Sequence, residues 1–304
     1  MHDSLFTRGG LSLDRLRSFL AFAEAGSISK AAAGDVSRQA LMSRQIRELE
    51  EFFGAELTVR RGKTIAPSPA GSRLEILIRG QFDDLERFQC DQKKQAKSFT
   101  FGAGASMLEW LVIPAAEKIR GLLANSTLRL SSQRSRELVE NVRDGRLDFA
   151  IVREDAIPSG AAYLPLFRLQ FHLCVSRKLY RQYPRTRLDD PATLSQLPFA
   201  ANAGGGQLDT TFRQAMIETC GSFQPIFECD SLLQVRDLIV QGACAGLLPS
   251  IGTRDLAPHE VVTREFGPLK NYGRGLALHW NERQMRRRDV EDAVIKKIAG
   301  ALSL

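Results

Sequence analysis

A single helical stripe near the N-terminus constrains the fold of this chain more than any other feature of its sequence. Four apolar residues recur there at helical spacing: Met42, Ile46, Leu49 and Phe53. On a wheel of 100° per residue they lie within about 60° of one another, which predicts a helix with one side in a core. The opposite side carries Ala40, Ser43, Arg44 and Arg47, with Gln39 at its flank. We expect that side to be exposed.

The segments around this helix complete a small module. Upstream, the apolar residues of 16–23 predict a first helix, and residues 29–33 predict a short, alanine-rich second helix. Downstream of Gly54, residues 57–59 predict a strand, residues 60–63 a basic hairpin tip, and residues 64–66 the returning strand. Three helices followed by a two-stranded wing predict a winged helix-turn-helix.

The exposed residues of this module have chemistry that can read a DNA duplex. Glutamine can form paired hydrogen bonds with adenine, arginine can do so with guanine, and an alanine methyl can contact thymine. We therefore expect base-edge contacts from four residues: Gln39, Ala40, Ser43 and Arg44. We expect contacts to phosphates or to the minor groove from five basic residues: Arg38, Arg47, Arg60, Arg61 and Lys63.

The distribution of charge supports this expectation better than the total charge does. The formal net charge is +7, a balance that permits nucleic-acid binding without requiring it. Residues 36–47 and 57–73, however, contain several basic residues and no acid. These two segments are the candidate phosphate contacts.

The rest of the chain is long enough for further domains. It has 304 residues, of which 43% are hydrophobic, so more than one core can form. Pro69 favours the start of a long helix, and residues 92–98 predict a polar linker. Five apolar residues of that helix are expected to share one face that needs a partner: Leu74, Leu77, Ile78, Leu85 and Phe88.

Strands and helices alternate from Phe99 onward. The first set comprises predicted strands at 99–105, 128–132 and 149–152, with helices at 106–123 and 135–144. The second set comprises extended segments at 199–202, 225–229 and 246–249, with helices at 209–220 and 232–241. A strand at 275–280 and a helix at 289–302 end the chain. This alternation predicts an α/β fold with parallel sheets and right-handed crossovers.

Several kinds of protein are disfavoured by what the sequence lacks. Residues 1–10 have no apolar signal-peptide core, and no window approaches the ~18 apolar residues of a membrane span. The five cysteines and four histidines show no metal-ligand spacing, so we expect a reducing, cytoplasmic setting with no metal and no cofactor. Gly102 and Gly104 lack the third glycine of a dinucleotide fingerprint, and Gly-x-Ser-x-Gly is absent. We predict no catalytic residues.

Two stretches of the chain resemble the LysR-type transcriptional regulators. The N-terminal stretch supplies the family's motif residues at matching spacings: Ala31-Ala32, Ser43-Arg44-Gln45-Ile46-Arg47-Glu48-Leu49-Glu50, Gly54, Leu57, Arg60 and Ser68-Pro69-Ala70-Gly71. Asp35, Ala40 and Thr58 depart from the leucine, proline and phenylalanine that are common there. The second stretch, residues 139–151, follows the family's helix–turn–strand signature. The resemblance covers nearly the whole chain.

The resemblance implies three parts and several partners. The parts are a winged helix-turn-helix at 1–68, a dimerisation helix at 69–97, and a two-lobed, periplasmic-binding-protein-like (type 2) effector domain at 98–304. Lobe one would span about 98–167 and 273–304, and lobe two about 168–272. The implied partners are double-stranded DNA with an inverted-repeat operator, a small-molecule effector, and further copies of the chain in a dimer or tetramer. RNA polymerase is a candidate partner, and no membrane is expected.

In such a two-lobed fold the ligand lies at the carboxyl ends of the strands, between the lobes. Ser106 lies where a strand meets a helix N-terminus, a position that favours a carboxylate. The expected ligand-binding residues are Ser106, Gln133, Arg134, Arg153, Asn202 and Gly204. Together they predict a small organic anion as the effector.

Two alternatives stay open at this point, a thiol-based redox sensor and an α/β enzyme. The redox reading depends on Cys220 and Cys229, which lie nine residues apart. The extended chain expected at 225–229 would separate their Cα atoms beyond the ~7 Å limit for a disulfide. We therefore expect no bridge between them without rearrangement.

Overall fold

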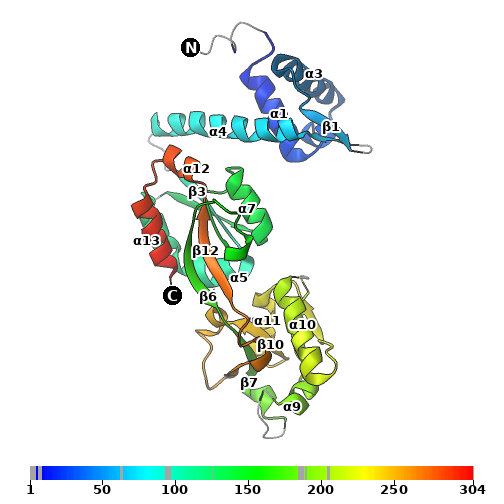
Figure 1. Ribbon diagram of the computed structural model, residues 1–304, viewed down its shortest axis with the longest axis vertical. Coiled ribbons are helices and arrows are strands. Elements are labelled where there is room, and N and C mark those ends of the chain that lie inside the picture. Colours follow the sequence, from blue (N-terminus) through cyan, green and yellow to red (C-terminus); the bar gives the residue numbers. More distant parts are fainter. Residues whose placement is uncertain are drawn as a thin grey trace. The chain divides into compact units, whose positions relative to one another are not determined.

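The chain folds around separate cores in two units, Met1–Gln95 and Ala96–Leu304. The structure, a computed structural model, describes residues 5, 9–61, 64–92, 97–124, 126–183, 188, 190–203 and 206–303 (Figure 1). None of the helices in these residues is both long and apolar enough to cross a membrane.

The N-terminal unit is a helical module followed by a hairpin and a long helix. Its elements are α1 (Leu13–Ala25), α2 (Ile28–Ala31), α3 (Val36–Phe53), β1 (Thr58–Arg61), β2 (Thr64–Pro67) and α4 (Pro69–Gln92). The apolar stripe of α3 is buried as predicted at Met42, Ile46 and Leu49, in one cluster with Phe19 and Phe22. The prediction for Phe53 was wrong. This residue ends α3 and is 39% exposed, because it lies beyond the core and packs edge-on against Phe52.

Asp35 defines the start of α3. Its side chain accepts a hydrogen bond from the Arg38 backbone N–H at 3.1 Å, which satisfies a donor that has no partner within the helix. Gly54 ends the helix in the left-handed conformation, with φ of 61°. The carboxylate at position 35, where leucine is common in the family, is therefore an N-cap in this chain.

Glu50 fixes the hairpin to α3. Its Oε1 atom accepts from the backbone N–H groups of Leu57 and Thr58, at 2.8 and 3.0 Å, and from the Thr58 hydroxyl at 3.0 Å. A phenylalanine at position 58 could not make the third bond. The departure at Thr58 is thus part of a polar link between α3 and β1.

The Ser68-Pro69-Ala70-Gly71 motif sets the start of α4. The Ser68 hydroxyl accepts from the Gly71 N–H at 3.0 Å and donates to the Glu56 carbonyl at 2.6 Å, and Pro69 is the first helical residue. A Cβ atom on Gly71 would lie 2.1 Å from the Leu57 carbonyl oxygen, so only glycine allows this approach.

The five apolar residues predicted to share a face of α4 lie within about 100° of one another on this helix, but only part of that face is buried. Ile78 is buried in the N-terminal core, and Leu74 packs against the same core. Leu77, Leu85 and Phe88 are 54%, 54% and 66% exposed. The helix therefore packs on its own unit through Leu74 and Ile78, and the rest of this apolar face is exposed to solvent.

The C-terminal unit contains two mixed five-stranded sheets, with orders β4-β3-β5-β12-β6 and β11-β7-β10-β8-β9. The strands of the first sheet, in lobe one, are β3 (Ser98–Ala103), β4 (Thr127–Ser132), β5 (Phe149–Arg153), β6 (Tyr163–Leu169) and β12 (Arg274–Trp280). The strands of the second, in lobe two, are β7 (Phe171–Ser176), β8 (Phe199–Asn202), β9 (Phe227–Cys229), β10 (Ala245–Pro249) and β11 (Val261–Glu265).

The helices of this unit follow the same division. In lobe one they are α5 (Ala105–Met107), α6 (Ile113–Leu122), α7 (Ser135–Arg143), α12 (Glu282–Arg287) and α13 (Asp292–Leu302), with a π-helical turn at Leu108–Val112. In lobe two they are α8 (Arg177–Tyr180), α9 (Pro191–Gln196), α10 (Gln207–Cys220) and α11 (Leu232–Gln241). Within lobe one, α7 and α13 lie on opposite faces of the sheet (Figure 1).

The parallel strand pairs were predicted correctly, and the antiparallel strands were largely missed. β3 pairs in parallel with β4 and β5, and β8 pairs in parallel with β9 and β10. β12 instead runs antiparallel to β5 and β6, and β7 runs antiparallel to β10 and β11. β6, β7 and β11 were absent from the prediction because no helix separates β6 from β7, so the alternating pattern fails there.

The predicted helix at 289–302 was also too long. It begins at Asp292, and α12 precedes it as a separate helix. Asp289 has a φ of 55°, which interrupts the right-handed helical path between the two.

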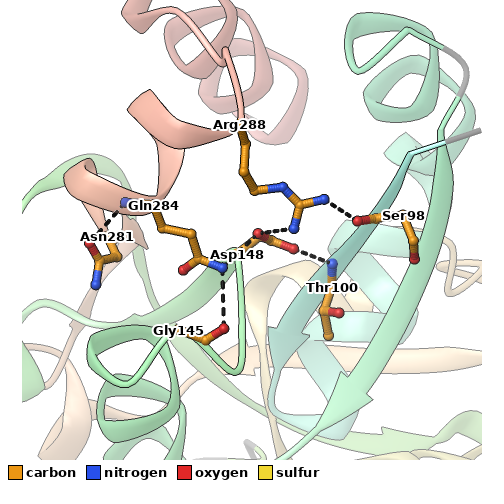
Figure 2. Close-up of polar contacts among 7 residues, drawn as sticks. All are labelled: Ser98, Thr100, Gly145, Asp148, Asn281, Gln284 and Arg288. Atoms are coloured by element: carbon orange, nitrogen blue, oxygen red, sulfur yellow. Dashed lines mark hydrogen bonds and ion pairs between the residues drawn. The ribbon is translucent and has the colours of Figure 1, made fainter. Parts of the chain in front are cut away.

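A buried polar cluster joins three parts of lobe one (Figure 2). Asp148, 2% exposed, precedes β5. Its Oδ2 atom accepts from the Thr100 N–H at 2.8 Å, and its Oδ1 atom accepts from Gln284 Nε2 at 3.0 Å and Arg288 Nη1 at 2.6 Å. Arg288 also donates to the Ser98 carbonyl. The buried carboxylate is thus fully partnered, and it ties α12 to the first strand of the unit.

Candidate functional site

The face of α3 opposite the core is the first candidate site. Arg38, Ala40, Arg44 and Arg47 are exposed, whereas Gln39 and Ser43 are half-buried. Arg60 is exposed on β1. Lys63 and the side chain of Arg61 lie outside the described residues. The described members of the set expected to contact DNA thus lie on the outside of α3 and on the adjacent hairpin.

Sequence reasoning missed Val36 on this face. Val36 is 77% exposed and lies four residues before Ala40, which places it about 40° away on the same side of the helix. The helical spacing alone could have identified it. An exposed valine can contact a thymine methyl group, as alanine can.

The side chain of Arg44 is held by Glu48, a residue of the same helix. Its Nε donates to Glu48 Oε1 at 2.9 Å, and the other carboxylate oxygen of Glu48 pairs with Nε of Arg15 from α1. Two hydrogen bonds lower the pKa of Glu48, and the one from Arg15 has a larger effect than the one from Arg44. The carboxylate is therefore ionised at neutral pH.

A cleft of about 930 Å³ between the two sheets of the C-terminal unit is the second candidate site. Five of the predicted ligand residues line it: Ser106, Gln133, Arg134, Arg153 and Asn202. Three of them follow β3 or β4, whereas Arg153 ends β5 and Asn202 ends β8, so the carboxyl ends of parallel strands meet there, as expected. Gly204 lies outside the described residues.

Most of these side chains already have partners within the protein. Gln133 donates to Ser131 Oγ at 3.0 Å and accepts from Asn141 Nδ2 at 2.6 Å. The carboxamide nitrogen of Asn202 lies 2.8 Å from the Cys229 carbonyl oxygen when the amide is oriented to satisfy its neighbours. These two residues therefore shape the walls of the cleft and leave few bonds for a ligand.

Arg153 connects the two lobes across the cleft. Its Nη1 donates to Oε1 of Gln207, the first residue of α10, at 2.8 Å, and its Nε lies 3.1 Å from Asp155 Oδ1. Gln207 and Arg274 also line the cleft and were missed by sequence reasoning. Arg274 donates to the Tyr272 hydroxyl from Nε, at 2.8 Å. Neither residue belongs to a motif, so no feature of the sequence identified Gln207 or Arg274 as part of the cleft.

The charge of the cleft lining is mixed. Arginines line it at Arg134, Arg136, Arg153 and Arg274, and acids at Glu137, Asp155, Asp209 and Asp230. Asp209 is 8% exposed and is neutralised by Arg213, which donates to it at 2.9 Å. Asp155 is paired with Arg153. Pairing thus reduces the repulsion that these two acids would exert on an anion.

The cysteines give little support to redox chemistry. Within the described chain four are free thiols: Cys174, Cys220, Cys229 and Cys244. The absence of a bridge between Cys220 and Cys229 agrees with the sequence prediction. Burial raises the pKa of Cys174 and of Cys244 to about 12, so both are protonated and poorly nucleophilic at neutral pH. The side chain of Cys90 lies outside the described residues.

Two family models match the chain. The model described as "LysR substrate binding domain" matches residues 92–294. The model described as "Bacterial regulatory helix-turn-helix protein, lysR family" matches residues 13–72.

Known proteins resemble the chain over almost its full length. The HTH-type transcriptional activator AmpR of Rhodobacter capsulatus is 26% identical over 276 residues, 88% of this chain and 90% of the relative. A solved variant of full-length OxyR from Pseudomonas aeruginosa has a TM-score of 0.62 at 18% identity and covers 96% of this chain and 94% of that one. CbnR, solved in complex with its target DNA, has a TM-score of 0.56 at 16% identity and covers 96% and 99%. At these identities the solved structures show a shared fold.

Proposed function

Because the chain belongs to the LysR family of transcriptional regulators, we propose that α3 reads an operator and that the cleft binds a small anionic effector. The corresponding parts are the DNA-binding domain at 1–68, the dimerisation helix at 69–97 and the effector domain at 98–304. The function is regulation of transcription by ligand-dependent DNA binding, and the relatives are themselves named as transcriptional regulators.

The observation that carries the DNA-binding proposal is the division of α3 into two sides. Met42, Ile46 and Leu49 anchor one side in the core, while Ala40 and Arg44 are exposed on the other. Glu50 joins the same helix to the hairpin, so the helix and the wing approach a duplex as one rigid body. Base edges would be read by Gln39, Ala40, Ser43 and Arg44, and phosphates or the minor groove would be contacted by Arg38, Arg47, Arg60, Arg61 and Lys63.

Two further points support the partners in this proposal. CbnR has been solved with its target DNA, and its fold matches this chain. The exposed part of the apolar face of α4, at Leu77, Leu85 and Phe88, fits a second copy of the helix in a homodimer. A two-fold dimer would bind an inverted-repeat operator, with its half-sites spaced by the dimer geometry.

The effector proposal depends on the charged groups of the cleft. Arg134, Arg153 and Arg274 supply positive charge, while Asp155 and Asp209 are each paired with an arginine. A carboxylate that displaces Gln207 from Arg153 would change the bond between the lobes. Ligand binding would then shift the balance between lobe arrangements, which is how such a signal could reach the DNA-binding units.

The test of the DNA-binding proposal compares Arg44→Ala with Arg60→Ala. Arg44→Ala should lose discrimination between an operator duplex and a single-base variant by about 1–3 kcal/mol. Arg60→Ala should weaken binding to all duplexes evenly. It should also reduce, by about 1, the magnitude of the slope of log affinity against log salt concentration. Fluorescence anisotropy on duplexes selected by the parent protein from a randomised pool measures both. Parent-like discrimination by Arg44→Ala would contradict the assignment of α3.

A further inference from the structure

Glu48 joins an exposed arginine to a fixed one. The side chain of Arg44 is 77% exposed, whereas those of Glu48 and Arg15 are 23% and 30% exposed. Glu48 binds Arg44 Nε through one carboxylate oxygen, at 2.9 Å, and Arg15 Nε through the other. A single carboxylate thus links the outward face of α3 to α1.

Arg15 is itself held in place by the start of α1. Its Nη1 donates to the hydroxyl of Ser12 at 3.4 Å, and its backbone N–H donates to the same hydroxyl at 3.3 Å. Ser12 is the N-cap of α1. The contacts therefore run from a helix cap, through Arg15 and Glu48, to the guanidinium of Arg44.

This arrangement limits how Arg44 can bind a base. An arginine can present two parallel N–H donors to the O6 and N7 atoms of guanine either from Nη1 and Nη2 or from Nε and one Nη atom. In Arg44, Nε is occupied by Glu48, and no hydrogen bond of Nη1 or Nη2 is found among the described residues. Only the end-on pair, Nη1 and Nη2, is left for a base.

We propose that Glu48 is a positioning residue that orients Arg44 for end-on contact with a guanine in the operator. This inference rests on the proposed function, since it requires Arg44 to read a base edge. Glu48 orders a long side chain before DNA arrives, so less conformational entropy is lost on binding. The two arginines also offset the charge of a carboxylate that would otherwise repel the duplex.

The test measures discrimination rather than affinity alone. A duplex selected by the parent protein from a randomised pool is compared, by anisotropy, with its single-base variants, and the position at which Arg44→Ala loses discrimination identifies the guanine. At that position Glu48→Gln should reduce the ratio of the two dissociation constants by roughly two- to twelvefold. Binding to the mismatched duplex should be unchanged or tighter, because a negative charge is removed.

Two variants serve as controls. Glu51→Gln makes the same charge change at an exposed position of α3 and should keep the parent's ratio. Arg15→Gln leaves Glu48 in place but removes its anchor to α1, and should reduce the ratio by a smaller factor. It keeps the test decisive if Glu48→Gln does not fold.

The outcomes separate the possible failures. If Arg44→Ala loses discrimination while Glu48→Gln and Arg15→Gln keep the parent's ratio, the positioning role is overturned and the proposed function stands. If Arg44→Ala loses no discrimination at any position, the base-reading role of Arg44 and the positioning role of Glu48 are both overturned. A purely structural role of Glu48 would lower the melting temperature and the active fraction, yet leave the ratio unchanged, and that result also overturns the inference.

Discussion

The outer face of α3 and the cleft between the lobes present polar side chains in opposite ways. The face of α3 is supplied by one helix, and its exposed residues lie within a few turns of one another. The cleft gathers residues from Gly104 to Arg274, carried by the ends of strands far apart in the sequence. The first surface follows from helical spacing, whereas the second exists only when both sheets are assembled.

The two surfaces also differ in how their side chains are held. On α3, Ala40 and Arg47 are exposed, and Arg44 has the one carboxylate partner described above. In the cleft, Gln133, Asn202 and Arg153 all bond within the protein. A ligand must therefore compete with bonds already made in the cleft, while DNA meets a face that is largely free to bind.

The largest effect on stability is expected from disrupting the buried polar cluster of lobe one, which carries one side of the cleft, while leaving α3 unchanged. Asp148→Ala leaves Arg288 without its buried partner and should lower the unfolding free energy of the C-terminal unit by about 3–5 kcal/mol. Both tryptophans, Trp110 and Trp280, belong to this unit, so fluorescence in a denaturant titration follows it alone. Asp237→Ala, an exposed control on α11, should change it by less than about 0.5 kcal/mol. Coincident curves for Asp148→Ala and the parent would refute the role of the cluster.

A second test concerns the mixed charge of the cleft. Arg153→Ala should reduce the affinity for an anionic ligand by about 1.5–3 kcal/mol, the usual worth of a hydrogen bond to a charged group. The ligand is first sought among organic acids by thermal shift, and its affinity is then measured by titration calorimetry. Arg136→Ala is the matched control, because that side chain also lines the cleft but is 92% exposed. Equal losses in the two variants would mean that net charge, rather than placement, decides binding.

A pH titration tests the stability of lobe one, which contains His279 and carries one side of the cleft. Burial lowers the pKa of His279, whose Nδ1 lies 2.8 Å from the Ala162 carbonyl oxygen. The unfolded chain then binds a proton more readily, so this contribution to stability is present above pH ~6.5 and is lost as the pH falls through the folded-state pKa. The slope from one group is at most about 1.4 kcal/mol per pH unit. Denaturant titrations at pH 7.5 and 5.5 should show this loss in the parent and in His259→Gln, and a smaller loss in His279→Gln.

The smallest expected effect concerns the link between α3 and the hairpin. Thr58→Val keeps the branched shape but removes the hydroxyl that donates to Glu50, so it should cost about 1 kcal/mol. Thermal unfolding followed by circular dichroism measures the stability, and anisotropy measures DNA binding. Thr58→Ser is the matched control, because it keeps the hydroxyl that donates to Glu50 and loses only the methyl group. A loss no greater in Thr58→Val than in Thr58→Ser would argue against a specific role for the Glu50 contact.

The comparison also explains which sequence predictions succeeded. The buried stripe of α3 and the parallel strands at β3, β5 and β8 were predicted because each can be recognised locally, the stripe by its helical spacing and the strands as short apolar runs. The predicted burial of Phe53 was wrong because burial depends on where the core ends, and helical spacing does not give that limit. Three strands, β6, β7 and β11, were not predicted. Their pairing is antiparallel, so they lack the intervening helix that marks a parallel crossover.

By itself the sequence determined the helical stripe, the exposed polar face of α3, the start of α4 at Pro69 and the family. Helical spacing and capping act between residues a few positions apart, so they can be read along the chain. Only the tertiary structure decided that Glu48 joins Arg15 to Arg44, that Asp148 meets Arg288 from 140 residues away, and that Gln207 and Arg274 face the cleft. These contacts join side chains from separate elements, and their positions are fixed by the packing of whole sheets and helices rather than by any local pattern.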